Sequence, residues 1–393
     1  MSQDPVVIVG MARTPMGAFQ GAFSSVSAPQ LGASAIKGAM KDAGLEAESV
    51  EQALMGCVLP AGQGQAPSRQ AAIYAGLGED TEATTVNKMC GSGMQSAIMA
   101  HDAIKAGSID VAVAGGMESM TNAPYLLPKA RGGMRMGNQQ VVDSMMHDGL
   151  TDAYEGGAMG VFADMIAAEY QFSREQQDAY AIESVARAKA AQERGAFDRE
   201  MTPVTVKGRK GDTVVTEDEG PKNARPEKIP SLRAVFTKDG TVTAANASSI
   251  NDGAAALVMM KKSQAIKDGH HILAEVVSHA AHAHAPEYFT TAPVHAMKKA
   301  LGKAGWNASD VDLWEINEAF AVVPMIAMQE LGLDHGKVNV NGGGCVLGHP
   351  IGASGARIIT TLIAAMEARN AHKGVASLCI GGGEATAICL SRG

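Results

Sequence analysis

The sequence predicts an α/β fold with a layered, duplicated core and an inserted segment rich in loops. Short runs rich in valine and isoleucine alternate with alanine-rich stretches typical of helices, which indicates α/β layering. These runs, which we interpret as strands, are Val6–Val9, Val111–Ala114, Leu257–Met260, Val338–Val340 and Val375–Ile380. The clearest long helix begins at Ser173, which forms a capping box with Gln176, and runs to Gly195.

The duplication is predicted from two stretches with the same layout. Each has a strand, a glycine-rich turn, a helix of small residues and a second apolar strand that ends in glycines. The first contains the strand Thr85–Met89, the turn Cys90–Gly93, a helix to Gly107 and the strand Val111–Gly116. The second contains Val338–Gly344, His349–Gly352, a helix beginning near Ala353 and Val375–Gly383. Because the two match weakly residue by residue, the layout supports a duplication without proving it.

Residues 119–249, between these stretches, carry several prolines among mixed charged segments and are interpreted as an inserted loop domain. We therefore expect one half formed by residues 1–118 and completed by 250–270, and a second half formed by 271–393.

Composition limits the class of protein. The 393 residues are 46% hydrophobic and 19% charged, as in globular proteins, and the net charge of −8 argues against nucleic-acid binding. Five scattered cysteines without C-x-x-C spacing suggest neither disulfides nor a zinc knuckle, so a reducing compartment is expected. The stretch Met1–Val9 carries no targeting signal, and no run is long enough to span a membrane. We expect a cytoplasmic protein without a membrane partner.

Cys90 and His349 are candidates for a nucleophile and its base. Cys90 follows an apolar run and precedes Gly91, Gly93 and a helix, where unpaired N–H groups stabilise a thiolate. His349 lies in a sharply bent glycine-rich turn and could take the thiol proton. A buried structural cysteine and an ordinary turn histidine are the alternative interpretations.

Cys379 and Asn317 are further candidates. Cys379 precedes three glycines beginning at Gly381, whose N–H groups could bind an oxyanion, and a second thiol suits proton transfer. Asn317 follows the strand-like run Leu313–Ile316, where ligands bind in α/β folds. A core cysteine and a helix-capping asparagine are the corresponding alternatives.

Five motifs resemble the thiolase family, specifically its acetyl-CoA acetyltransferase (acetoacetyl-CoA thiolase) branch, and the resemblance covers the whole chain. They are Cys90-Gly-Ser-Gly, Ala114-Gly-Gly-Met-Glu-Ser119, Asn317-Glu-Ala-Phe, Gly348-His-Pro-Ile-Gly-Ala-Ser-Gly-Ala-Arg357 and Cys379-Ile-Gly-Gly-Gly. The resemblance implies the thiolase fold, with a duplicated αβαβα core.

The resemblance also implies roles for individual residues. Cys90 matches the nucleophile that becomes acylated, His349 its activating histidine and Cys379 the acid/base that exchanges the α proton of acetyl-CoA. Asn317 matches a residue that holds a water, which with His349 forms one oxyanion hole. The N–H groups of Cys90 and Gly381 form another. The acyl-CoA site is expected at Ser248, which contacts the pantetheine, and at Leu150, Met159, Phe236, Ala244, Phe289 and Ala319.

The implied reaction is the reversible condensation of two acetyl-CoA molecules to acetoacetyl-CoA and coenzyme A, through an acyl-cysteine and with ping-pong kinetics. Coenzyme A is then substrate and product, with no cofactor and no metal. The resemblance further implies a homotetramer, a dimer of dimers, in which Ser119–Ser144 matches the loop that pairs dimers.

Two departures from the short-chain branch concern specificity and potassium. Ala158 stands before Met159 where that branch commonly has a histidine, which leaves open a broader-chain 3-ketoacyl-CoA thiolase of fatty-acid β-oxidation. Asp218–Ala224 lacks the tyrosine of potassium-dependent relatives, so no potassium site is inferred.

Other functions are disfavoured. A non-catalytic acyl-CoA binder would not need all four reactive positions, and ketosynthase-type enzymes pair one cysteine with two histidines or with histidine and asparagine. His279, His282 and His284 lack acidic or cysteine neighbours in the sequence, so a metal site is not expected there.

Overall fold

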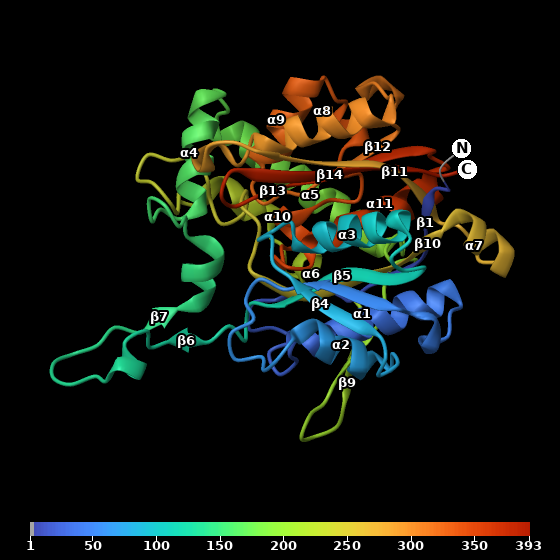
Figure 1. Cartoon of the computed structure of the whole chain (residues 1–393). Coiled ribbons are helices and arrows are strands. Elements are labelled where there is room, and N and C mark those ends of the chain that lie inside the picture. Colours follow the sequence, from blue (N-terminus) through green and yellow to red (C-terminus); the bar gives the residue numbers. More distant parts are fainter. Residues whose placement is uncertain (1–3) are drawn as a thin grey trace.

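Five layers of helices and strands are stacked in the computed structural model, which describes residues 4–393 (Figure 1). Nine of the strands follow one hydrogen-bonded path, β12-β13-β14-β11-β1-β10-β5-β3-β4. The halves of this path meet only at a short antiparallel contact, where Val7 and Ile8 of β1 face Glu275 and Ala274 of β11. The predicted α/β layering is confirmed.

Each half of the strand path has the same internal order. The amino-terminal half comprises β1 (Val6–Arg13), β3 (Gln52–Gly56), β4 (Glu82–Val86), β5 (Val111–Ser119) and β10 (Asn251–Lys261). The carboxyl-terminal half comprises β11 (Ala274–Ala283), β12 (Leu313–Ile316), β13 (Lys373–Ile380) and β14 (Glu384–Ser391). The order β3-β5-β10-β1 corresponds to β12-β13-β14-β11, and in both the first pair is parallel and the others antiparallel. A repeated strand order is what a duplicated core requires.

The helices divide between outer and central layers. The outer layers contain α1 (Ala28–Ala43), α2 (Pro67–Ala75), α8 (Ala292–Ala304) and α9 (Val322–Leu331), and the central layer contains α3 (Ser92–Ala106) and α11 (Ser354–Arg369) (Figure 1). α11 is buried without interruption from Ser354 to Met366, as expected for a helix covered on all sides. Strands such as β1 are also buried along their whole length, which explains their unbroken apolar sequence.

Glycines allow the two central helices to touch near their amino-terminal ends. A β-carbon on Gly93 would lie 2.8 Å from the backbone nitrogen of Ala356, and one on Gly355 would lie 2.3 Å from that of Met94. Side chains at either position would separate α3 from α11. This close approach brings the loops that precede the two helices together, and those loops carry Cys90 and His349.

Residues between β5 and β10 form helices and hairpins around one end of the core (Figure 1). They comprise β6 (Tyr125–Leu126), β7 (Val142–Asp143), a π-helix (Met145–Leu150), α4 (Met159–Glu169), α5 (Arg174–Glu193), β8 (Val204–Val206), β9 (Thr213–Val215) and α6 (Glu219–Asn223). The predicted long helix is α5, with the capping box of Ser173 and Gln176 in place. We propose the division into residues 1–118 with 250–270, 119–249 and 271–393 on this basis.

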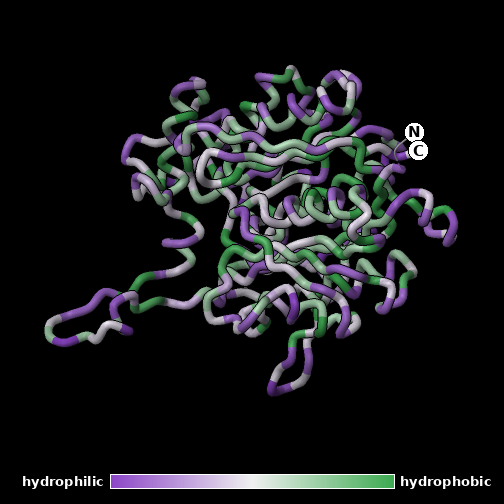
Figure 2. Tube along the Cα trace, in the orientation of Figure 1, coloured by the Kyte–Doolittle hydropathy of each residue, from purple (hydrophilic) through white to green (hydrophobic). Residues whose placement is uncertain are grey.

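Two hairpins project from the core, and Figure 2 shows their tips as largely hydrophilic. One consists of β8 and β9, and the longer one consists of β6 and β7 (Figure 1). The remaining short elements are β2 (Gly17–Ala18), α7 (Lys262–Asp268), α10 (Gly344–Leu347) and the 3-10 helices Ala47–Ser49, Ala130–Gly132, Pro226–Ser231, Pro286–Tyr288, Ala308–Asp310 and His335–Lys337. In residues 4–393, no helix combines the length and apolar character needed to span a membrane.

Two strand predictions need correction. The strand predicted at Thr85–Met89 ends at Val86, because the chain turns through Met89, whose φ is 45°. Val338–Val340 is not a strand: Val338 makes one isolated bridge to Trp314, and Asn339 has a φ of 47°. The side chain of Asn339 instead bonds the backbone of Ile316 through both its oxygen and its nitrogen, each at 2.8 Å. An apolar run could not reveal this side-chain pairing.

Candidate active site

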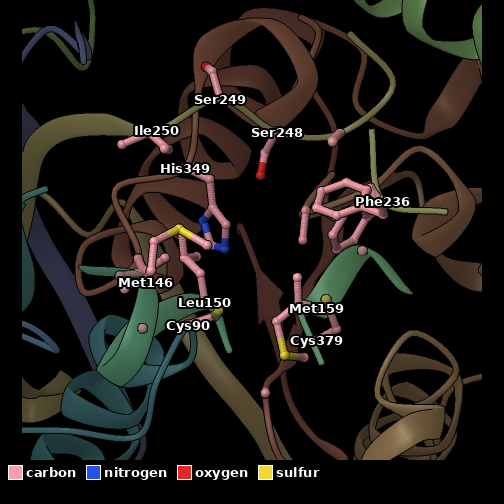
Figure 3. A pocket seen from close by; sticks show the side chains of 18 of the residues that line it. Cys90, Met146, Leu150, Met159, Phe236, Ser248, Ser249, Ile250, His349 and Cys379 are labelled. Atoms are coloured by element: carbon pink, nitrogen blue, oxygen red, sulfur yellow. The ribbon is translucent and has the colours of Figure 1, made fainter. Parts of the chain in front are cut away.

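A cavity of about 500 Å³ lies where the loops before the central helices meet the inserted segment (Figure 3). It contains all of the predicted site residues except Asn317: Cys90, His349, Cys379, Gly381, Ser248, Leu150, Met159, Phe236, Ala244, Phe289 and Ala319. These positions are far apart in the sequence, so the fold brings the predicted site together in one place.

Cys90 lies in the tight turn between β4 and α3. Met89 precedes it in the left-handed region, a conformation that costs about 1–3 kcal/mol for a residue with a side chain and that recurs at active sites. A β-carbon on Gly91 would lie 2.3 Å from Cδ1 of Ile380, so this glycine lets the turn approach the end of β13. Burial raises the pKa of the Cys90 thiol to about 11, whereas backbone N–H groups of Gly381 and Cys90 act in the opposite direction. The resting cysteine is therefore a thiol that already faces two N–H donors.

His349 follows Gly348, whose φ is 96°, and its ring is held by the start of α11. Nδ1 lies 2.6 Å from Oγ of Ser354, and that hydroxyl lies 2.9 Å from the carbonyl oxygen of Pro350. The other ring nitrogen, Nε2, is buried and has no partner in residues 4–393. Burial, with a smaller contribution from Arg357, lowers the pKa of His349 to about 3. A neutral imidazole thus presents one free nitrogen to the cavity.

Asn317 lies behind His349 at the end of β12, outside the cavity lining. Its Nδ2 is 3.4 Å from Nδ1 of His349, and its Oδ1 accepts a hydrogen bond of 3.3 Å from Nη2 of Arg357. Arg357 is fully buried and lies 3.8 Å from a carboxylate oxygen of Glu315. Because the arginine occupies Oδ1, the amide nitrogen of Asn317 is directed toward His349. The capping interpretation of Asn317 is not supported, since α9 begins at Val322.

Cys379 lies on β13, one residue before the strand ends, and is buried. Burial raises the pKa of its thiol well above the ordinary value, and the neighbouring Cys90 raises it further. The turn that follows contains Gly382 and Gly383 with φ values of 92° and 83°, which favour glycine. Gly381 at the start of this turn lines the cavity, with its N–H directed to Cys90.

Glu118 joins the loop after β3 to the loop that follows His349. Its carboxylate accepts hydrogen bonds from the N–H groups of Val58 (2.9 Å), Leu59 (3.2 Å) and Gly352 (2.8 Å). Burial nevertheless raises its pKa to about 7, because desolvation outweighs these three bonds. Glu118 belongs to one of the recognised motifs, but only the structure shows that it holds the loop after His349.

The residues predicted to contact acyl-CoA line two sides of the cavity, with Leu150 beside His349 and Phe236 and Met159 opposite (Figure 3). The hydroxyl of Ser248 points into the cavity, and Phe236 and Met159 lie near it (Figure 3). Ala158, at the amino-terminal cap of α4, also lines the cavity, as does Phe289, whereas Tyr154 is 74% exposed and does not.

Sequence reasoning missed several residues of this region. Ser354 belongs to the motif that contains His349 but has no predicted role, although a hydroxyl five residues after a histidine, at a helix start, is a recognisable signal. Other lining residues carried no sequence signal: Met120, Met146, Val235, Ser249 and Ile250. They are apolar or small, and only the tertiary structure assigns them.

The structure has five alternating layers of helices and strands, and Cys90, Cys379 and His349 surround one cavity. These features place the chain among the layered α/β enzymes. Family models match nearly all of it: "Thiolase, N-terminal domain" at residues 6–263 and "Thiolase, C-terminal domain" at residues 270–392. The chain belongs to the thiolase family, whose members are acyltransferases.

Relatives match over their full length. The chain is 48% identical to the acetyl-CoA acetyltransferase of Chromobacterium violaceum, covering 98% of this chain and 99% of that protein. It is also 48% identical to the acetyl-CoA acetyltransferase of Schizosaccharomyces pombe, with both covered completely. The crystal structure of Acat5 thiolase from Ascaris suum in complex with coenzyme A superposes with a TM-score of 0.94 at 43% identity, covering 99% of this chain and 100% of that one. The predicted thiolase fold is confirmed.

Proposed function

We propose that this protein is an acetyl-CoA C-acetyltransferase, which condenses two acetyl-CoA molecules reversibly to acetoacetyl-CoA and coenzyme A through an acetyl-cysteine. Relatives that share almost half of the sequence over the full chain carry that name. The observation that carries the proposal is the set of groups around the cavity: a thiol facing two N–H donors, a neutral imidazole with a free Nε2 and a second thiol. No metal or redox cofactor has a role in this reaction.

The first half-reaction is acyl transfer to Cys90. Nε2 of His349 takes the thiol proton as the sulfur attacks the thioester carbonyl, because a neutral imidazole is a suitable base for sulfur. The carbonyl oxygen becomes an oxyanion that the N–H groups of Cys90 and Gly381 bind. The carbon–sulfur bond to coenzyme A then breaks, the departing thiolate takes the proton from Nε2 of His349, and acetyl-Cys90 remains.

The second half-reaction is condensation. Cys379 takes a proton from the methyl carbon of a second acetyl-CoA, and the enolate oxygen is bound by His349 and by a water that Asn317 holds. The carbanion attacks the acetyl carbonyl, a carbon–carbon bond forms and the bond to Cys90 breaks. The departing Cys90 sulfur takes the proton from Cys379, which returns to the thiolate form that began the step. Burial of Cys379 disfavours its thiolate, so this step depends on preorganised donors that stabilise the enolate.

The acetyl-cysteine is tested by mass spectrometry of protein mixed with acetyl-CoA and digested at low pH. We expect one acetyl group on the peptide that contains Cys90. The peptide containing Cys345, a partly exposed cysteine outside the cavity, is the internal control. A protein that turns over acetoacetyl-CoA while Cys90 stays unmodified would overturn the mechanism.

A second candidate function, thiolysis of longer 3-oxoacyl-CoA chains, is favoured by Ala158 in the cavity wall. An Ala158→His variant should have a narrower substrate range, with a higher kcat/KM for acetoacetyl-CoA relative to 3-oxohexanoyl-CoA. The two further methylenes of 3-oxohexanoyl-CoA are together worth about 1.6 kcal/mol when accommodated, or about 15-fold in kcat/KM. If wild type already rejects 3-oxohexanoyl-CoA and the variant leaves the ratio unchanged, the acetyl-specific proposal stands.

Assembly and location complete the proposal. The β6–β7 arm exposes apolar side chains, with Met136 92% exposed, and such surface on a projecting arm favours association with other subunits. We propose a homotetramer, a dimer of dimers, in which this arm pairs the dimers. All five cysteines are free, which fits a cytoplasmic location.

A further inference from the structure

Three histidines converge outside the catalytic cavity. His282 lies near the end of β11, His284 follows that strand and His295 lies on α8. Each offers a ring nitrogen, and these three atoms all lie within 4.8 Å of one another. The rings of His282 and His295 stack with centroids 4.5 Å apart, and those of His282 and His284 meet edge to face at 4.9 Å.

The hydrogen bonds around this cluster leave one ring nitrogen unsatisfied in the described part of the chain. Nε2 of His282 is buried and has no hydrogen-bond partner in residues 4–393. Burial lowers the pKa of His282 and of His295, and the neighbouring rings and two nearby lysines lower it further. Neutral imidazoles are the form that binds metal, because the ligating nitrogen must carry no proton.

We propose that His282, His284 and His295 form a binding site for a divalent transition-metal ion of the Zn²⁺, Cu²⁺ or Ni²⁺ class. Imidazole nitrogen suits these ions, and three histidines leave one position open for water. Tetrahedral zinc with bonds of 2.0–2.1 Å needs nitrogens about 3.4 Å apart. Side-chain rotation must therefore close at most about 1.4 Å, and His295 is exposed and free to turn.

This grouping differs from the one in the sequence. His279 is also on β11, but its Nε2 bonds Asp102 at 2.9 Å, and Asp102 also bonds His101 at 2.9 Å. His295 takes its place beside His282 and His284, because α8 packs on β11. A helix residue 12 positions beyond the end of the strand completes a set that the Ala-His-Ala-His pattern alone did not indicate.

Lys299 competes with a bound ion. Its Nζ lies 3.1 Å from Nδ1 of His282, and its positive charge opposes a cation at this cluster. An imidazole that binds metal through Nε2 carries its proton on Nδ1, so Lys299 has to move away. Removing this charge should tighten binding by about 2- to 5-fold, the range for exposed charge pairs.

The cluster adjoins the proposed oxyanion turn. The N–H of His284 donates to the carbonyl of Gly383 at 3.0 Å, and its Nε2 lies 2.8 Å from the carbonyl oxygen of Tyr288. Phe289, the next residue, lines the cavity. Because a bound ion would redirect the ring of His284, we expect occupation of the site to slow thiolysis.

The site is tested by titrating the full protein with Co²⁺ and Zn²⁺, using absorption spectroscopy for the first ion and calorimetry for the second. We expect one ion per chain, a tetrahedral Co²⁺ spectrum without a sulfur charge-transfer band, and about 10-fold or greater loss of affinity in His295→Ala. His271→Ala removes an exposed histidine outside the cluster and should bind as wild type does. Lys299→Gln should bind more tightly.

Several results would overturn the proposal. Binding that survives His295→Ala but is lost in Asp102→Asn would place the ion at His101, Asp102 and His279 instead. A sulfur charge-transfer band would place it on the cysteines. The proposed coupling predicts that Zn²⁺ slows thiolysis reversibly in wild type and not in His295→Ala, and equal inhibition of both proteins would contradict it. These outcomes are independent of the acetyl-cysteine test.

Discussion

The hydroxyl of Ser354 is predicted to serve His349 in both half-reactions. When His349 acts as base, the ring carries its proton on Nδ1 and donates it to Oγ of Ser354, while the hydroxyl donates to Pro350. When Nε2 holds the proton for the enolate oxygen, the hydroxyl can rotate and donate to Nδ1. Ser354→Ala removes both arrangements, and Asn317 can replace only the second, at the longer distance of 3.4 Å.

The size of the effect follows from burial. Ser354 is fully buried, so its removal leaves Nδ1 of His349 without a hydrogen-bond partner, at a cost of about 1–3 kcal/mol. At about 1.4 kcal/mol for each factor of 10, acylation should slow by about 5- to 150-fold. KM should change little, because Ser354 does not line the cavity. The substitution leaves the fold intact, since alanine fits the start of a helix.

The assay is the burst of coenzyme A released when acetyl-CoA acylates the enzyme, measured from pH 6 to 9. Thr360→Val is the matched control, because it removes another buried hydroxyl of α11, one that bonds only the helix carbonyl of Ala356 at 3.0 Å. A burst rate for Ser354→Ala within about 2-fold of the Thr360→Val rate would refute the role of Ser354 in positioning His349.

Further predictions concern the two thiols and the arm. Cys379→Ser should keep acylation of Cys90 and lose condensation, measured as separate half-reactions, and equal loss of both would assign Cys379 a different role. Alkylation of free Cys90 by iodoacetamide should accelerate with pH beyond pH 9, because the thiolate fraction rises toward a pKa of about 11, and a plateau at neutral pH would indicate a thiolate–imidazolium pair. Replacing the arm between Leu126 and Val142 by a short turn should convert tetramers to dimers in light scattering, and an unchanged mass would exclude the arm from that contact.

Local sequence was sufficient where short-range physics decides the structure. The capping box at Ser173 located α5, and valine-rich runs located β1, β5, β10 and β13, because strands buried on both faces need unbroken apolar sequence. The glycines around Cys90 indicated a tight turn before a helix, which the structure confirms. The resemblance of five motifs to the thiolase family predicted the fold. Every predicted site residue except Asn317 lines one cavity.

Tertiary structure alone decided which groups meet across long stretches of sequence. Val338–Val340 has the composition of a strand, but Asn339 pairs with the backbone of Ile316 and forces a turn. Local sequence predicts the layering, the turn at Cys90 and the candidate residues, because periodicity and glycine act over short distances along the chain. The packing of α3 on α11 determines how His349 is held, and the packing of α8 on β11 brings His295 to His282. Such contacts depend on the path of the whole chain, so local sequence does not reveal them.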